Sequence, residues 1–167
     1  LFISNLSATR YFTPRNSTEM EAAMSKEIPA DIHVEKTDSG EITLAEVRFF
    51  EAKRDAFPLY ESLRTAILQN CGPTEIQVKK TQISFVKRHL FGAVSFTPVR
   101  RAKERPDPYI TVTFGLSYQI DSPRIDAAVE AYPHRFTHHL IIGSVEEIDG
   151  ELIGWLREAA DFACSKR

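Results

Sequence analysis

Hydrophobic residues recur at helical spacing in two stretches that follow residue 42. Thr43-Leu44-Ala45-Glu46 has the form of a capping box, in which side chains at both ends of the motif accept backbone N–H groups, and it predicts a short helix to about Lys53. A second helix is expected after Asp55, with Pro58 in its first turn and Gly72 at its end. The apolar stripe of this helix consists of Leu59, Leu63, Ala66 and Ile67.

From Glu75 the hydrophobic period falls to two, which predicts strands with one polar face. The alternating apolar residues are Ile76 and Val78, Ile83 and Phe85, Val94 and Phe96, and Ile110, Val112, Phe114 and Leu116. Residues 121–132 are ambiguous, because Ser122-Pro123 could open a helix while the apolar residues from Ile125 to Ala131 alternate. We favour an edge strand there. A further strand is expected over Phe136–Ile142.

A second capping box, Ser144-Val145-Glu146-Glu147, is expected to open the last helix. The apolar stripe of that helix consists of Ile148, Leu152, Trp155, Leu156, Ala159, Phe162 and Ala163. Helices followed by strands and one more helix predict an α+β fold, an antiparallel sheet of about five strands with two to three helices packed on one face. Residues 1–41 are polar and irregular and are interpreted as an N-terminal arm or extension, and residues 42–167 as a single α+β domain.

Composition places the 167-residue chain among water-soluble domains, since no apolar run approaches the roughly 20 residues of a membrane span. We expect no membrane contact and a cytoplasmic location, because Cys71 and Cys164 are far apart and no secretory signal precedes the domain. The seven glycines form no phosphate-binding loop, and no metal-ligand spacing is present. The sequence therefore predicts no cofactor and no metal.

Charge is distributed unevenly along the chain. Residues 79–105 hold eight Lys and Arg but one acid, a charge of +7 within a chain of net charge −2. Four of these cations lie on or beside strands with small polar outward residues: Lys79, Lys80, Lys87 and Arg88. This pattern predicts a polar sheet face for an anionic ligand. Tyr109 is the main aromatic residue on that face, so nucleic acid is a weakly supported partner.

Three histidines lie close together in His134-Arg135-Phe136-Thr137-His138-His139. Strand alternation places His134 and His138 on one face and His139 on the other. A metal site would need a third ligand from elsewhere, so hydrogen-bonded structural histidines are the preferred interpretation. An acid/base role of His138 or His139, with the hydroxyl of Thr81 or Ser84 nearby, is the enzymatic alternative.

Several short motifs occur in a specific order along the chain. They are Thr43-Leu44-Ala45-Glu46, Leu59-Tyr60-Glu61-Ser62-Leu63, Cys71-Gly72-Pro73, the segment from Lys79 to Phe85, Phe91-Gly92-Ala93-Val94, Pro123-Arg124-Ile125, His138-His139-Leu140-Ile141-Ile142, Ile148-Asp149-Gly150-Glu151-Leu152 and Trp155-Leu156-Arg157-Glu158-Ala159. In this order the chain resembles a large family of small bacterial domains without an assigned activity, domain-of-unknown-function family 5655. The resemblance implies a small α+β domain and supplies no catalytic residues.

Our leading hypothesis is a non-enzymatic binding module for an anionic ligand or a protein partner. The predicted ligand-binding residues are Lys79, Lys80, Thr81, Lys87, Arg88, His138 and His139. One alternative is a small enzyme of hydrolase or transferase type that uses a histidine as acid and base. Another is a self-associating structural module, in which residues 1–41 are exchanged across a homodimer.

Overall fold

The structure, a computed structural model, describes residues 40–165. The predicted N-terminal arm, residues 1–41, therefore lies outside the described residues except for its last two positions. Within residues 40–165, no helix combines the length and the apolar character that crossing a membrane requires.

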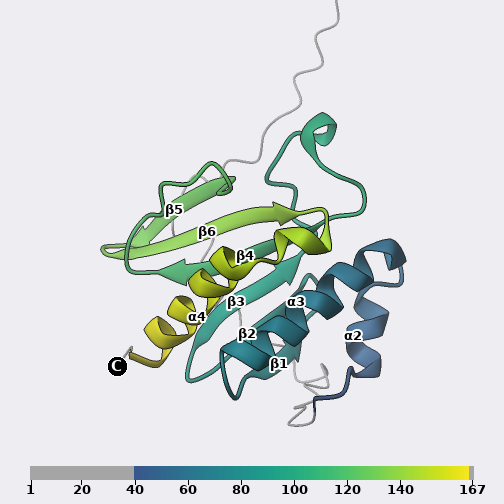
Figure 1. Cartoon of the computed structure of the whole chain (residues 1–167), viewed down its shortest axis with the longest axis horizontal. Coiled ribbons are helices and arrows are strands. Elements are labelled where there is room, and N and C mark those ends of the chain that lie inside the picture. Colours follow the sequence, from purple (N-terminus) through teal and green to yellow (C-terminus); the bar gives the residue numbers. More distant parts are fainter. Residues whose placement is uncertain (1–39, 166–167) are drawn as a thin grey trace, which may run out of the picture.

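Six antiparallel strands form one open sheet in the order β1-β2-β3-β4-β6-β5 (Figure 1). The strands are β1 (Glu75–Val78), β2 (Gln82–Val86), β3 (Leu90–Ser95), β4 (Ile110–Leu116), β5 (Ala127–Tyr132) and β6 (Arg135–Ile142). The α+β prediction is confirmed, with one strand more than the five or so expected. The edge strand favoured within residues 121–132 is present as β5, which pairs with β6 alone.

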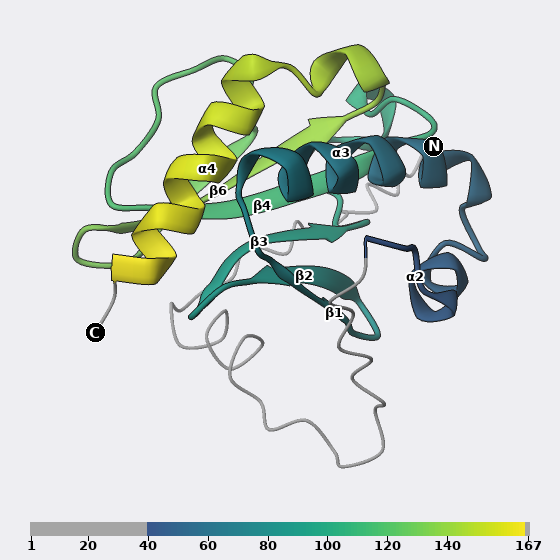
Figure 2. The same ribbon diagram turned by 60° about the horizontal axis from the view of Figure 1, so that its bottom comes forward.

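Three α-helices accompany the sheet, and two of them lie across one of its faces. They are α2 (Leu44–Phe49), α3 (Phe57–Asn70) and α4 (Gly150–Ser165). Figures 1 and 2 show α3 and α4 on the same side of the sheet, while α2 lies beside α3. Three short 3-10 helices lie in the connections: η1 (Arg54–Ala56), η2 (Ala102–Glu104) and η3 (Val145–Glu147). The opposite face of the sheet carries none of these three α-helices, and we call it the outer face.

The first capping box is present, but the helix that it opens is shorter than predicted. The Thr43 hydroxyl accepts from Glu46 N at 3.2 Å, and the Glu46 carboxylate accepts from Thr43 N at 2.8 Å. Helix α2 ends at Phe49 rather than near Lys53. The chain turns at Phe50, whose ring is almost fully buried and packs 5.0 Å from the Tyr60 ring. Tertiary packing of this aromatic residue thus ends the helix early.

The second capping box is also present, but it does not open the last helix. Ser144 and Glu147 cap the 3-10 helix η3, and Ile148 then leaves helical geometry with ψ of 68°. Helix α4 begins only at Gly150, and the Asp149 carboxylate accepts from Leu152 N at 3.0 Å near its start. The predicted helix start was wrong because Ile148 separates two capped segments. Leu152, Leu156 and Ala159 of the predicted stripe are fully buried.

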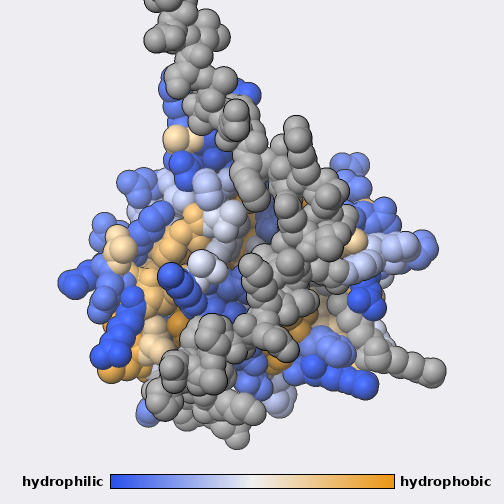
Figure 3. Space-filling model, turned by 180° about the vertical axis from the view of Figure 1, so that it is seen from behind, coloured by the Kyte–Doolittle hydropathy of each residue, from blue (hydrophilic) through white to orange (hydrophobic). Residues whose placement is uncertain are grey.

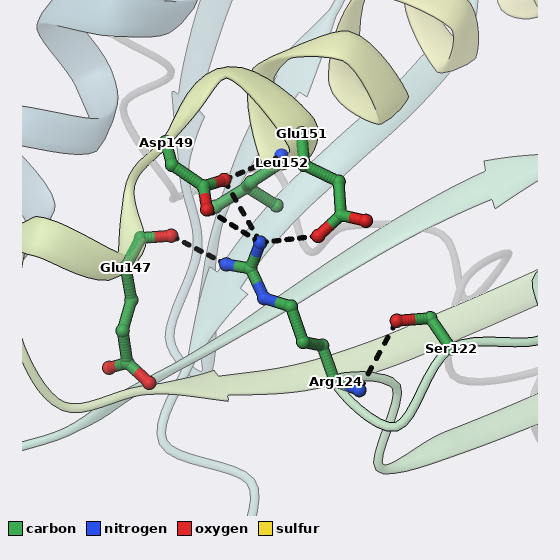
Figure 4. A network of polar contacts seen from close by, with 6 residues as sticks. All are labelled: Ser122, Arg124, Glu147, Asp149, Glu151 and Leu152. Atoms are coloured by element: carbon green, nitrogen blue, oxygen red, sulfur yellow. Dashed lines mark hydrogen bonds and ion pairs between the residues drawn. The ribbon is translucent and has the colours of Figure 1, made fainter.

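Arg124 joins the β4–β5 connection to the start of α4 (Figure 4). Its guanidinium donates to both Asp149 carboxylate oxygens at 2.9 Å, to Glu151 Oε2 at 2.7 Å and to the Glu147 carbonyl at 2.7 Å. It also lies 5.8 Å from the Trp155 ring centroid. These contacts fix the edge of the sheet that carries β5 against the helical layer.

Glu46 forms a buried ion pair that joins α2 to α3. Its side chain, like that of Arg64, is almost fully buried, and Arg64 Nε lies 2.7 Å from Glu46 Oε1. The Tyr60 hydroxyl donates to the same carboxylate oxygen. Arg64 also donates to the carbonyls of Gly40 and Glu41. Burial, followed by the hydrogen bond to Glu46, raises the pKa of Tyr60 far above its usual range.

We predict that Glu46→Gln lowers the free energy of unfolding by about 3 kcal/mol, because it leaves the Arg64 charge buried without its counter-ion. Chemical denaturation followed by circular dichroism measures the loss. Glu51→Gln, at an exposed position just after α2, is the matched control and should change stability by less than about 0.5 kcal/mol. A loss for Glu46→Gln as small as that of the control would contradict the assigned role of the pair.

Candidate functional site

At the centre of the sheet, several strand positions with large side chains face the helices while their neighbours on the outer face are small. In the register of β3, β4 and β6, Val94 pairs with Val112 and Val112 with Leu140, all on the helical side. The outer face receives the alternate positions: Ala93, Thr113, Gly115 and Thr137. Since a sheet stacks side chains of equal register in rows, these four small residues leave a hollow in the middle of the outer face.

A groove of about 530 Å³ lies over this hollow. Its floor includes the four small residues, and much of its remaining lining is apolar: Val86, Leu90, Phe91, Phe114, Leu116, Ala131, Tyr132, Phe136 and, from α4, Phe162. The groove thus lies mostly on the outer face and also reaches residues of the helical layer. Figure 3 views the molecule from the outer face, where hydrophobic areas lie beside hydrophilic side chains. The volume is within the range of roughly 300–1,000 Å³ that is typical of small-molecule sites.

The charged groups that line the groove are all basic. Lys79, Arg88 and Arg135 contribute to the lining together with His89, and no Asp or Glu is found among the described lining residues. Within residues 40–165, the side chains of these three cations have no hydrogen bond or ion pair. By contrast, Arg64, Arg100 and Arg124 are each paired with a carboxylate. The groove thus has a positive lining with free donors.

Two of the cations lie at the same end of the sheet. Arg88 lies in the turn between β2 and β3, and Arg135 directly follows the turn between β5 and β6. Antiparallel order places both turns at one end, three strand spacings or about 14 Å apart. Lys79 follows β1 at the opposite end of β2, near Gln82. Gln82 and Arg88 are six positions apart, so the groove extends for at most about 20 Å along β2 and the turn that follows it.

The predicted ligand residues of the basic segment are only partly brought together. Lys79 and Arg88 line the groove, whereas Lys80 and Thr81 are exposed in the β1–β2 turn and are not among its lining residues. Lys87 points toward the end of α3, since its Nζ lies 3.9 Å from the place that a Cβ on Gly72 would occupy. Burial raises the pKa of the Cys71 thiol there, and Lys87 acts in the opposite direction.

His138 lies on the helical side of β6 and is fully buried. Its ring stacks on Phe114 with centroids 5.3 Å apart, and Nε2 accepts from Ile120 N at 3.0 Å. An accepting Nε2 places the proton of the neutral ring on Nδ1, which has no hydrogen-bond partner among residues 40–165. Burial lowers the pKa of His138, against a smaller raising effect of the Phe114 backbone. The ring is therefore held neutral and away from the groove.

His139 lies on the outer face, next to the groove floor. Its Nδ1 is 2.9 Å from the Thr113 hydroxyl, and Thr113 lines the groove while His139 is not among its lining residues. Burial, and next the neighbouring His138, lower the pKa of His139, whereas Asp126 raises it. The Ser84 hydroxyl, on the same face, is fully buried. Among residues 40–165, no three His, Cys, Asp or Glu side chains lie where they could share a metal ion.

Tyr109, the aromatic residue that sequence analysis singled out, is occupied by other contacts. Its hydroxyl donates to the Phe96 carbonyl at 3.1 Å, and the Lys53 ammonium and the Arg105 guanidinium lie 4.4 Å and 5.4 Å from its ring centroid. Only 7% of its surface is exposed. This arrangement leaves little of the ring for stacking on a base.

Sequence reasoning missed Arg135 and His89 as lining residues of the groove. His89 directly follows Arg88, which was predicted. Correct boundaries for β2 and β3 would have placed both residues in the same tight turn and so identified His89 as well. Arg135 lies 47 positions after Arg88, and only the pairing of β6 between β4 and β5 brings the two turns to one end of the sheet. No local pattern carries that information.

A family described as "Domain of unknown function (DUF5655)" matches residues 46–163 of the chain. The matched range begins in α2 and ends in α4, so it includes all six strands and the groove between them. No curated protein and no solved structure matches the chain.

We predict that the protein loses stability as the pH falls below about 6.5, the usual pKa of histidine, because the folded state holds His138 and His139 at lowered pKa values. Unfolding then takes up protons that the native state does not bind. Denaturation at a series of pH values measures the slope of the free energy of unfolding against pH. His138→Gln should reduce it by up to about 1.4 kcal/mol per pH unit, the limit for one proton.

Phe114→Leu is the control for this variant, because it disturbs the same stack and keeps the histidine. It should lower stability at every pH while the slope between pH 7 and pH 5 stays that of the original protein. An unchanged slope in His138→Gln would contradict the assignment of His138 as a group held neutral by burial.

Proposed function

The chain belongs to the DUF5655 family, whose description assigns no activity, and we propose that it is a non-enzymatic binding module that takes an anionic ligand in the groove on the outer face of its sheet. The ligand in this proposal is a small molecule or a short flexible group that fits a volume of about 530 Å³. The arginines of the groove, Arg88 and Arg135, supply its main polar contacts.

The observation that carries the proposal is the charge of the lining. Three cations without a described partner and no described carboxylate create a positive potential over a partly enclosed surface. Low-dielectric walls concentrate such a potential and draw in anions. Arginines in particular bind carboxylate and phosphate oxygens with two parallel hydrogen bonds.

Binding accounts for these features better than acid/base catalysis does. A general acid or base must come within hydrogen-bond reach of its substrate, whereas His138 is buried on the other side of the sheet. His139 has a hydroxyl neighbour, but the lining of the groove includes Thr113 and not the imidazole. Nucleic acid is disfavoured as a ligand because Tyr109 is enclosed by its own contacts.

We predict that small anions raise the melting temperature of the full chain at low salt, since a ligand bound only by the native state stabilises it by mass action. Acetate, inorganic phosphate, a nucleotide and a fatty carboxylate form the test panel, measured by thermal shift and confirmed by calorimetry. The Arg88→Gln/Arg135→Gln double variant should weaken binding of every active anion by about tenfold or more.

Arg48→Gln/Arg54→Gln is the matched control, because it removes the same charge from two exposed arginines outside the lining of the groove. It should leave binding essentially unchanged. Equal losses in the two double variants would mean that the anions respond to overall charge, which would contradict a site in the groove. Absence of binding by the whole panel at low salt would refute the proposal and favour a protein partner.

A further inference from the structure

We propose that the ligand of the groove is an amphiphilic carboxylate, with its head group between Arg88 and Arg135 and an unbranched apolar chain along the small-residue floor. This inference rests on the proposed function, because it names the ligand class of the same site. It adds that the apolar part of the ligand contributes most of the affinity.

The floor of the groove favours an apolar chain over a polar one. Ala93 and Gly115 offer no side-chain hydrogen-bonding group, and the Thr113 hydroxyl is engaged with His139 at 2.9 Å. Thr137 is the one floor residue whose hydroxyl has no described partner, so a sugar or a chain of phosphates would lose hydrogen bonds to water here and regain few of them from the protein, which is costly. A hydrocarbon chain instead covers apolar surface and releases water from it.

The shape of the groove also fits a chain. It extends for at most about 20 Å, and its floor consists of two neighbouring rows of small side chains, Ala93 with Thr113 and Gly115 with Thr137, on β3, β4 and β6. Val86 and Leu90 form apolar parts of the lining at the end that carries Arg88. Polar side chains, Gln77, Lys79 and Gln82, form the lining at the other end. The apolar part of the ligand is thus bounded in length at both ends.

The head-group end follows from the positions of the two arginines. Their turns are about 14 Å apart at one end of the sheet, and both side chains reach the lining of the same groove. A carboxylate between them could accept paired hydrogen bonds from one guanidinium and a charge-assisted bond from the other. Neither arginine has a described partner that it would have to release.

The test is calorimetric titration of the full chain with octanoate, dodecanoate, dodecanol and inorganic phosphate, below the concentrations at which micelles form. We expect affinity to rise from octanoate to dodecanoate by about two- to fourfold for each added methylene, the gain from burying it. Dodecanol, which has the same chain without the charge, should bind about tenfold more weakly than dodecanoate.

Gly115→Leu fills the floor and tests the location. A Cβ at this position would lie 3.8 Å from the Phe136 carbonyl, an ordinary contact, so the strand can accept the side chain. The variant should weaken dodecanoate binding by at least about tenfold, because the leucine occupies the volume of the chain. Gly154→Leu is the control, since it adds the same side chain to α4 where a Cβ meets no atom within 4 Å, and it should bind as the original protein does.

The outcomes distinguish failure of the amphiphilic ligand from failure of the proposed function. Phosphate binding that Arg88→Gln/Arg135→Gln abolishes, together with no dodecanoate binding, would uphold the proposed function and refute the amphiphilic ligand. Equal binding of dodecanol and dodecanoate would overturn the head-group assignment, and unchanged binding in Gly115→Leu would overturn the location. If neither phosphate nor any carboxylate binds, both the inference and the proposed function fail.

Discussion

The alternation of side chains along antiparallel strands determines both the core and the outer face of this protein. Each residue of β4 faces either the helices or the outer face, and a shift of register by one residue would exchange the two sets. On the helical side, Val112 and Phe114 are buried and pack in the core. On the outer side, Thr113 and Gly115 are small and leave the groove. The same alternation of residues therefore forms the core on one side of the sheet and the candidate site on the other.

The same constraint separates His138 from His139. Adjacent positions on β6 place one ring in the core, stacked on Phe114, and the other beside Thr113 on the outer face. Burial keeps His138 neutral, and its ring packs in the core, so this residue contributes to stability and does not contact the ligand. The helical layer is held in place elsewhere, by the buried pair of Glu46 with Arg64 and by the contacts of Arg124 with the start of α4.

Much of the fold could be predicted from the sequence because the signals were local. Alternation identified the strands, including the edge strand β5, and both capping boxes form as the motifs indicate.

The errors were in helix boundaries. Packing of Phe50 against Tyr60 ends α2 early, and this tertiary contact is not visible in helix propensities. The non-helical backbone of Ile148 delays the start of α4, and a single backbone angle of this kind cannot be read from the sequence either. The candidate site was harder to predict, because its cations are joined only by strand order. Lys87 and Arg88 are neighbours in sequence, yet only Arg88 lines the groove, and Arg135 joins it through the placement of β6.

Nuclear magnetic resonance titration with dodecanoate shows whether the outer face of the sheet holds a ligand over its small residues. We expect the backbone amide signals of Ala93, Thr113, Gly115 and Thr137 to shift together and saturate with one affinity, while those of the exposed side of α4 stay in place. Shifts that appear in the first turns of α4, or that spread over the whole surface without saturation, would contradict a ligand site in the groove.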